Sequence, residues 1–215
     1  MKHRFSLLWI AASVWATAPA AGAADDWQYW NEFVLGHEVT DKLALGLAFQ
    51  QKWQDNFSDL FLYSAAFVPT VSLAKGVTFG AGYRWERRKD EDQWTTENRL
   101  LFPLALKWTL EPWTIRWRNQ PEYRELEDKD RWRIRERILV ERPVRLGPSI
   151  VTPFASEEVF YDFTEGETNQ NRLAVGLSLP VRERLSLDLF YMSKAEKDGH
   201  WSFANVLGTE LSIEF

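Results

Sequence analysis

The sequence predicts an all-β fold class, a transmembrane antiparallel up-and-down β-barrel of about 10–12 strands. Apolar and polar residues alternate with a period of two from Trp27 onward, and turn residues interrupt this alternation at short intervals. The chain also holds 12 Trp, 14 Phe and 6 Tyr, although its mean hydropathy is -0.37. A conventional core does not account for so many aromatic rings in a chain this polar. A wall that faces lipid would account for them.

Residues 1–23 have the pattern of a secretory signal peptide. Lys2 and Arg4 give a positively charged start, a short apolar stretch follows, and Ala21-Gly22-Ala23 is an A-x-A cleavage site. The apolar stretch is too short to cross a membrane as a helix, and no later segment approaches the ~20 apolar residues that a spanning helix needs. We therefore expect a single barrel domain over residues 24–215, which would enter a membrane as strands.

The charge balance of the chain is acidic. The formal net charge is -5, and it becomes -7 when the two basic residues of the signal peptide are removed. This balance argues against a nucleic-acid partner. The chain has no cysteine, so disulfides neither support nor oppose an oxidising compartment.

Roughly eleven strand-like segments follow one another along the chain. The clearest early ones place on one face Leu43, Leu45, Leu47 and Phe49, and then Val77, Phe79, Ala81, Tyr83 and Trp85. A later segment sets Trp113, Ile115, Trp117 and Tyr123 opposite Thr114, Arg116, Arg118, Gln120, Glu122 and Arg124. The last segments repeat the scheme in rows that begin at Leu173, Leu185 and Trp201. Two such faces cannot share one environment.

The segment count conflicts with the even strand numbers of bacterial single-chain barrels. Either the first segment, Trp27–His37, lies outside the wall, which gives ten strands, or two strands are merged in one segment, which gives twelve. The sequence leaves the count open between ten and twelve. Tight connections such as Pro180–Arg184 alternate with more polar, usually longer ones such as Ala195–His200. This contrast is typical of an outer-membrane barrel, and with Phe215 at the periplasmic rim the tight turns fall on the periplasmic side.

Alternation alone does not say which face meets lipid, because a soluble barrel also alternates, with its apolar residues inside. Segment lengths of ~11–14 residues favour the membrane, since soluble strands typically have ~5–6 residues. Tryptophans also gather near the segment ends, as an interfacial girdle requires. They are Trp27, Trp53, Trp85, Trp94, Trp108, Trp113, Trp132 and Trp201.

The chain ends in an aromatic residue. Gly208, Leu211, Ile213 and Phe215 belong to a terminal run that resembles the C-terminal strand signal by which the barrel assembly machinery recognises outer-membrane proteins. Together with a signal peptide, this tail predicts a location in the bacterial outer membrane. The expected partners are outer-membrane lipid and the barrel assembly machinery.

If the apolar face meets lipid, the opposite face fills the lumen with a belt of charged residues. The predicted belt contains Glu97, Arg99, Arg116, Arg118, Glu122, Arg124, Arg131, Arg133, Arg135, Arg137, Glu158 and Arg172. Arg at the midplane of a lipid-facing strand costs about 2–4 kcal/mol, so the inward orientation is the only sensible one. Glu136 falls on the lipid face in this pattern, so either a bulge shifts the register there or the residue lies near a rim.

The charge belt allows two interpretations. Arg and Glu on neighbouring strands can interlock and plug a narrow barrel, which is a structural role. Alternatively, an excess of lumenal Arg makes a narrow passive channel that favours small anionic solutes. Arg131, Arg133, Arg135 and Arg137 lie on one face of one strand, so neighbouring carboxylates or a ligand must neutralise them.

The order of these features resembles a family of uncharacterised bacterial outer-membrane proteins, domain of unknown function 2490. The matching residues are Trp30, Glu97-Asn98-Arg99, Arg118, Glu122-Tyr123-Arg124, Arg131-Trp132-Arg133, Glu158 and Asn169-Gln170-Asn171-Arg172. The likeness covers nearly the whole mature chain. It implies a barrel fold and brings no established activity.

The sequence does not indicate an enzyme. Only His37 and His200 remain as candidate general bases once the signal peptide is removed, and each is expected to be an exposed loop or girdle residue. No G-x-S-x-G, metal-spaced His or Cys set, or phosphate-binding Gly loop occurs, so no metal or cofactor is expected. The alternative is an outer-membrane rim hydrolase that acts on envelope lipid or peptide through His200, beside Asp198 and Ser202.

Overall fold

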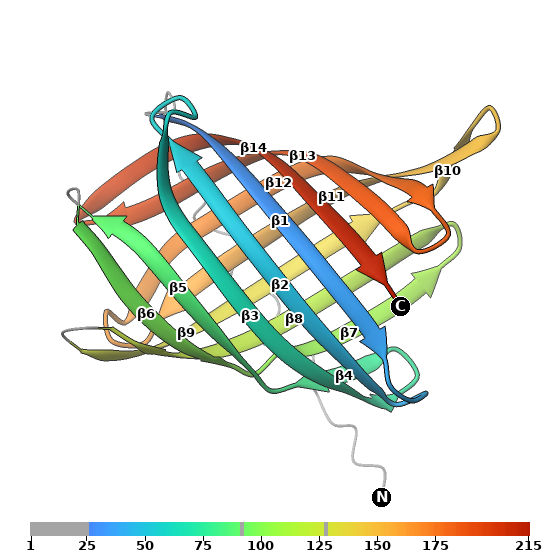
Figure 1. The fold of residues 1–215 in the computed structure, drawn as a ribbon, viewed down its shortest axis with the longest axis horizontal. Coiled ribbons are helices and arrows are strands. Elements are labelled where there is room, and N and C mark those ends of the chain that lie inside the picture. The colour runs from blue at the N-terminus through green and yellow to red at the C-terminus, as the bar shows by residue number, and fades with distance from the viewer. Residues whose placement is uncertain (1–25, 91–92, 127–128) are drawn as a thin grey trace, which may run out of the picture.

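The computed structural model describes residues 26–90, 93–126 and 129–215. The predicted signal peptide, residues 1–23, lies outside the described residues. The described part of the chain contains no helix, and so none long and apolar enough to span a membrane. It consists of strands joined by turns (Figure 1).

Fourteen strands follow one another in the described chain. They are β1 (Asp26–Glu38), β2 (Leu43–Gln54), β3 (Asp59–Ala74), β4 (Val77–Gly80), β5 (Gly82–Asp90), β6 (Gln93–Leu101), β7 (Leu104–Leu110), β8 (Trp113–Glu125), β9 (Asp130–Glu141), β10 (Val144–Leu146), β11 (Ser149–Asp162), β12 (Glu167–Arg182), β13 (Leu185–Asp198) and β14 (His200–Glu214).

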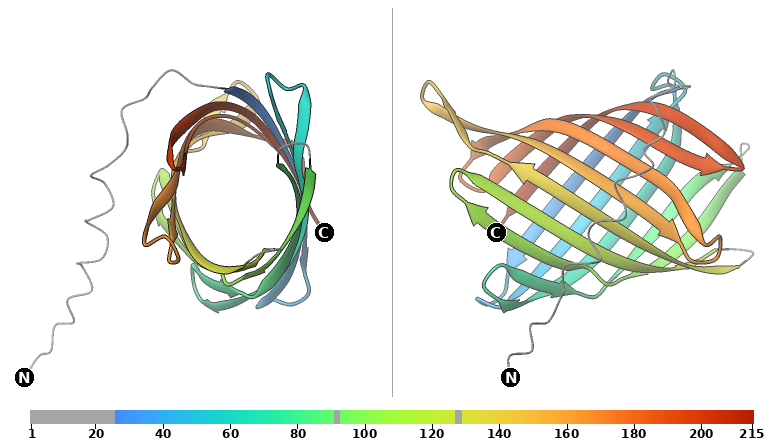
Figure 2. Two further views of the ribbon diagram at one scale, coloured as in Figure 1. Left: turned by 90° about the vertical axis from the view of Figure 1, so that its left-hand side faces the viewer. Right: turned by 180° about the vertical axis from the view of Figure 1, so that it is seen from behind.

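Three strands of the wall are each interrupted once. Ala81 separates β4 from β5, Phe102 and Pro103 separate β6 from β7, and Arg142 and Pro143 separate β9 from β10. Proline has no N–H to donate to the next strand, so it interrupts the hydrogen-bond ladder. Counted as wall strands, the fourteen segments make eleven, in one sheet that closes on itself (Figure 2). The predicted all-β barrel of about 10–12 strands is confirmed.

The barrel closes between its first and last strands. β1 and β14 pair in parallel, from Asp26 opposite Ala204 to Gly36 opposite Glu214. An up-and-down barrel with an odd number of strands has first and last strands that run in the same direction, so this pair must be parallel. The first segment belongs to the wall and pairs with both β14 and β2, so the count of eleven, which lies within the predicted range, needs neither of the two adjustments to an even number.

We call the end of the barrel where β1 begins the Asp26 rim, and the opposite end, where the chain finishes, the Phe215 rim. The Phe215 N–H donates a hydrogen bond of 2.9 Å to the Gly36 carbonyl, which holds the last residue against β1. At the Phe215 rim, the hairpin formed by β10 and the start of β11 extends beyond the neighbouring strands (Figure 1).

The connections at the two rims differ little in length in the described chain. At the Asp26 rim, residues 55–58 join β2 to β3, residues 163–166 join β11 to β12, and Gly199 alone joins β13 to β14. At the Phe215 rim, residues 39–42 join β1 to β2, and each of the other four connections has two residues. The expected contrast between short turns and longer loops is therefore weak, because residues assigned to loops from their polarity, such as 195–198, continue the strands.

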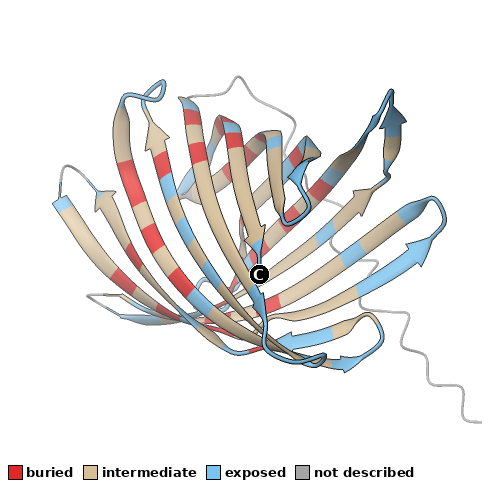
Figure 3. Cartoon of the chain, turned by 45° about the vertical axis from the view of Figure 1, so that its right-hand side comes forward, coloured by how far each residue is buried: buried red, intermediate tan, exposed pale blue. Residues whose placement is uncertain are grey.

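The two faces of the wall differ as the alternation predicts. Outward residues of β2 and β12 are strongly exposed, with Phe49 at 46 % and Leu173 at 56 %. Inward residues of the same strands, Lys52 and Ala174, are buried. Within the strands, buried positions alternate with intermediate and exposed ones, and the turns are mostly exposed (Figure 3).

Large and small residues alternate along one row of the inner face. Phe154, Gly176, Phe190, Gly208 and Trp30 are successive cross-strand neighbours on β11, β12, β13, β14 and β1. A Cβ atom on Gly208 would lie 2.0 Å from the Phe190 ring, so this glycine provides the space that the ring occupies. The row packs the inside of the wall, and Trp30 belongs to its small buried apolar cluster.

Glu136 is the one predicted register conflict, and neither expected explanation is right. β9 pairs with β8 and β11 without a register shift, and Glu136 is near the middle of the strand, opposite Asn119 and Val159 on the outer face. The Trp117 indole donates a hydrogen bond of 2.8 Å to its Oε1 atom. An outward-facing partner on the neighbouring strand therefore satisfies this carboxylate in place.

Candidate functional site

A cavity of about 1180 Å³ occupies the inside of the barrel. Its lining reaches from Lys197 and Ser202 near the Asp26 rim to Val34 and Asp188 toward the Phe215 rim. Fifteen of the lining residues are Lys or Arg, and nine are Asp or Glu. The lining has a positive excess although the whole chain has a formal net charge of -5.

Most of the predicted charge belt lies at this cavity. Ten of its twelve residues line it: Glu97, Arg99, Arg118, Arg124, Arg131, Arg133, Arg135, Arg137, Glu158 and Arg172. Glu122 lies behind the lining, where it is fully buried. Arg116 lies outside it, because its side chain is 54 % exposed and pairs with Glu141 at 2.7 Å.

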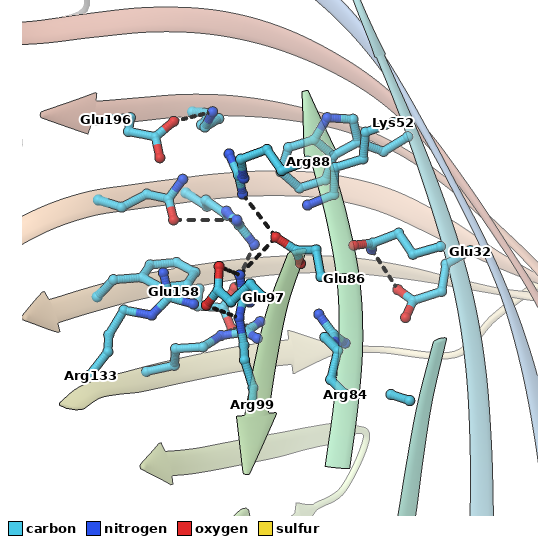
Figure 4. Close-up of a pocket in the computed structure, with 18 of the residues that line it drawn as sticks. Glu32, Lys52, Arg84, Glu86, Arg88, Glu97, Arg99, Arg133, Glu158 and Glu196 are labelled. Carbon is cyan, nitrogen blue, oxygen red and sulfur yellow. Dashed lines mark hydrogen bonds and ion pairs between the residues drawn. The ribbon is translucent and has the colours of Figure 1, made fainter. Parts of the chain in front are cut away.

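Glu86 and Glu97 organise one group of ion pairs. Arg99 donates from Nε to Glu97 at 2.6 Å and from Nη2 to Glu86 at 2.8 Å. Arg124 bonds Glu97 at 3.0 Å, and Arg88 bonds Glu86 at 3.3 Å. Figure 4 shows Glu86 between Arg88 and Arg99. These pairs connect β5, β6 and β8 across the inner face of the wall.

Glu122 and Glu158 organise a second group. Arg135 bonds both carboxylates, with distances of 3.0 Å to Glu122 and 2.9 Å to Glu158. Arg118 and Arg172 also pair with Glu158, at 2.7 and 3.3 Å. Three guanidinium groups therefore share the Glu158 carboxylate, which leaves an excess of positive charge around it.

Cross-strand neighbours form rows that wind around the lumen. A basic row contains, on successive strands of the wall, Arg118, Arg137, Glu158, Arg172 and Lys194. An acidic row contains Asp188, Glu210, Glu32, Gln50, Ser64, Glu86 and Glu97. Like charges that lie directly opposite each other destabilise a sheet, so each row depends on partners outside it.

The four arginines of β9 meet different partners. Arg131 pairs with Glu165 at 2.7 Å, and Arg133 bonds Glu122 from Nε at 3.1 Å. Arg135 pairs with two carboxylates, as described above. Arg137 bonds only the Ser156 hydroxyl, at 3.3 Å. Carboxylates thus pair directly with the first three, whereas Arg137 forms no ion pair within the described residues, although Glu158 lies opposite it on β11.

Trp30 lies between two cations. Lys52 Nζ is 3.6 Å from the centre of a Trp30 ring, and the Arg172 guanidinium carbon is 4.7 Å from it. The face of an indole attracts cations, so Trp30 stabilises two like charges that would otherwise repel each other. The Arg172 group also lies 4.5 Å from the Phe160 ring centre.

Several charged lining residues lie beyond the predicted belt. Among them are Glu32, Lys52, Arg84, Glu86, Arg88, Asp188, Lys194, Glu196 and Glu210. The same period of two places each of these nine on the inner face, so extending the alternation to the early and the last segments would have found them. The prediction missed them because it followed only the segments where arginine is dense.

The sequence matches a known protein family over most of its length. The sequence model described as "Protein of unknown function (DUF2490)" matches residues 27–202. The chain belongs to this family. A search of curated proteins found no match. The resemblance inferred from the sequence motifs is therefore confirmed, and it carries no activity with it.

In this DUF2490 member, the inward-facing residues that carry the family resemblance contact one another. Glu97 bonds Arg99 and Arg124, and Arg172 connects Trp30 with Glu158. These residues come from β1, β6, β8, β11 and β12. The short motifs are far apart in sequence, but the barrel brings them together at the lumen.

The two candidate histidines lie at opposite ends of the barrel. His37 is exposed near the Phe215 end of β1, and His200 is exposed at the start of β14, at the Asp26 rim. Within residues 26–90, 93–126 and 129–215, no group of three or more His, Asp or Glu side chains is arranged to hold a metal ion.

The residues of the predicted assembly signal occupy both faces of β14. Gly208 faces inward beneath Phe190. Leu211 and Ile213 lie opposite Phe33 and Leu35 of β1 at the parallel seam. Phe215 follows the strand at the rim, with its side chain 59 % exposed.

Proposed function

We propose that this chain is an integral outer-membrane barrel whose lumen is a narrow passive channel that favours small anionic solutes. The observation that carries the proposal is the charge of the cavity lining, with fifteen Lys or Arg residues against nine Asp or Glu residues. Rings of Arg and Lys select anions in pores of this kind. The mechanism is electrostatic selection, with no catalytic step, metal or cofactor.

The outer face supports the membrane placement. Exposed aliphatic and aromatic residues such as Phe49, Leu173 and Val175 surround the wall, whereas soluble monomers rarely expose contiguous apolar patches larger than a few hundred Å². Tryptophans lie near both strand ends, including Trp132 at the Asp26 rim and Trp108 toward the Phe215 rim. Such rings suit the two interfaces of a bilayer.

The density of ion pairs favours a second, structural role. The residues Glu86, Glu122 and Glu158 are at most 6 % exposed. Each of these carboxylates accepts hydrogen bonds from at least two arginines. A lumen that these pairs close would carry no ion current. The barrel would then act only as a structural component of the outer membrane.

Planar-bilayer recordings of the refolded protein decide between these roles. The channel proposal predicts a small conductance whose reversal potential in a KCl gradient shows a preference for chloride. Absence of any current would leave the structural role, and a preference for potassium would overturn the argument from the cavity charge.

Arg84 offers a variant that tests the electrostatic mechanism. Its side chain faces the cavity and forms no ion pair with another described residue, so Arg84→Gln removes positive charge without leaving a carboxylate unpaired. We expect this change to weaken the anion preference. Arg145→Gln is the matched control, because Arg145 is exposed on β10 outside the cavity and should leave selectivity unchanged.

A further inference from the structure

Two guanidinium groups at the cavity form no ion pair within the described residues. Arg137 donates to the Ser156 hydroxyl, and its cross-strand neighbours are Arg118 on β8 and Glu158 on β11. The Glu158 carboxylate is already paired with Arg118, Arg135 and Arg172. Arg84 forms no ion pair within the described chain, and its Nε atom is buried without a hydrogen-bond partner. The buried Nε atom of Arg118 also lacks a partner. Buried donors are normally satisfied, so these groups indicate a missing acceptor.

Three carboxylates at the same cavity lack a cationic partner. Asp188, Glu210 and Glu32 are direct cross-strand neighbours on β13, β14 and β1. Glu32 accepts a hydrogen bond of 3.2 Å from Gln50, and Glu210 accepts one of 3.2 Å from Ser212. No ion pair reaches any of the three from the described residues. Adjacent carboxylates repel each other, so a cation between them would be stabilised.

The two sets of charges belong to different parts of the wall. In the order of strands around the barrel, three neighbouring strands carry the carboxylates, while Arg84 is on β5 and Arg137 on β9. All five residues line the same cavity. Arg137 interacts electrostatically with Asp188 and Glu210, and Arg84 with Glu32. In none of these pairs are the charged groups close enough to form an ion pair. Figure 4 shows Arg84 and Glu32 in this shared space.

We propose that the lumen binds a small zwitterionic solute, with its anionic group at Arg84 and Arg137 and its cationic group at Asp188, Glu210 and Glu32. A purely anionic solute would satisfy only the guanidinium groups, and a purely cationic one only the carboxylates. A solute with both charges satisfies both sets at once. This inference deepens the proposed channel function and rests on it for the route by which a solute enters.

Isothermal titration calorimetry on the refolded protein in detergent micelles tests this proposal without a membrane. The probes are γ-aminobutyrate, butyrate and butylamine, which have similar size and carry both charges, only the negative one, or only the positive one. We expect γ-aminobutyrate to bind about tenfold more tightly than either single-charge probe, since charge-assisted hydrogen bonds contribute on that scale. Equal binding of all three, or binding of none, would overturn the proposal.

Variants assign the two halves of the site. Arg137→Gln should weaken γ-aminobutyrate binding and leave butylamine binding unchanged, whereas Glu210→Gln should weaken γ-aminobutyrate binding and leave butyrate binding unchanged. Arg145→Gln is the charge-matched control outside the cavity. Heat-modifiable migration on a gel verifies that each variant is folded. Variants that weaken all probes equally would contradict the assignment.

The outcomes separate this inference from the proposed channel. Conductance without a preference for γ-aminobutyrate would retain the channel and remove the zwitterion site. A barrel that binds γ-aminobutyrate but carries no current would retain the site and overturn the channel.

Discussion

The indole nitrogen of Trp117 donates a hydrogen bond of 2.8 Å to Oε1 of Glu136 on the outer face of the wall. If that face meets hydrocarbon, no water can replace the bond when the donor is removed. Trp117→Phe should then lower the free energy of unfolding from lipid vesicles by about 1.5–3 kcal/mol, the usual contribution of a hydrogen bond to a charged group. Urea titration monitored by fluorescence measures this change.

The control for Trp117 is another outward tryptophan. Trp108 is 46 % exposed, and Trp108→Phe removes a similar ring without removing a bond to a carboxylate. We expect its effect to be clearly smaller than that of Trp117→Phe. Equal losses in the two variants would indicate that water solvates Glu136, and would argue against a lipid-facing wall.

The parallel seam can be tested by cross-linking. Asn31 on β1 lies opposite Thr209 on β14, and its Nδ2 atom donates a hydrogen bond of 2.8 Å to the threonine hydroxyl. The chain has no cysteine, so paired substitutions can be introduced without background. Asn31→Cys with Thr209→Cys should form a disulfide under mild oxidation, because directly opposite Cα atoms lie within the range that a disulfide spans.

A displaced pair is the control for this cross-link. Asn31→Cys with Asn205→Cys moves one cysteine four residues along β14, a distance of about 13 Å at the rise of a strand. We expect no disulfide from this pair. Efficient cross-linking of the displaced pair and failure of the direct pair would overturn the register of the closure.

Side-chain orientation could be predicted from the sequence because it depends only on local alternation. Leu173 is strongly exposed and Arg99 is buried, as the period of two requires. The alternation also places Glu136 on the correct, outer face. Its partner could not be found in the same way, because Trp117 is adjacent only through the register of β8 and β9, which no local pattern specifies.

The parallel pairing that closes the barrel could not be predicted from local sequence patterns, for a related reason. Eleven segments are visible in the sequence, but the assumption of an even count argued against them. Closure brings β1 beside β14 in any case, but whether the two strands run parallel, and so which residue of β14 lies opposite Trp30, depends on the parity of all the strands between them. The same applies to Arg137, because Glu158 lies opposite it on β11 but is paired with Arg118, Arg135 and Arg172, which belong to three different strands.

Glu122 is the carboxylate whose loss should most destabilise the lumen. It is fully buried and bonds Arg133, Arg135 and Gln120. Glu122→Gln preserves the shape but leaves two buried guanidinium groups with less neutralisation, so we expect unfolding to become easier by about 3–5 kcal/mol. Urea titration of the refolded barrel gives the value.

An ion pair at the rim provides the comparison for Glu122. Glu165 pairs with Arg131, and its side chain is 38 % exposed. Glu165→Gln should cost less than about 1 kcal/mol, because water screens an exposed pair. If both variants had the same small effect, water in the lumen would be solvating the Glu122 group of ion pairs.

A substitution of Phe215 can distinguish the stability of the barrel from its assembly in the cell. Its side chain is 59 % exposed, and its visible attachment to the barrel is the backbone hydrogen bond to Gly36, which any residue can make. Phe215→Ala should therefore leave refolding into vesicles nearly unchanged. If the tail is the signal for the barrel assembly machinery, the same variant should insert into the outer membrane of living cells several-fold less efficiently.

Phe79→Ala, which removes an exposed aromatic ring of β4 at the same rim, should leave insertion unaffected. Equal insertion of the Phe215 and Phe79 variants would show that the final aromatic residue carries no assembly information.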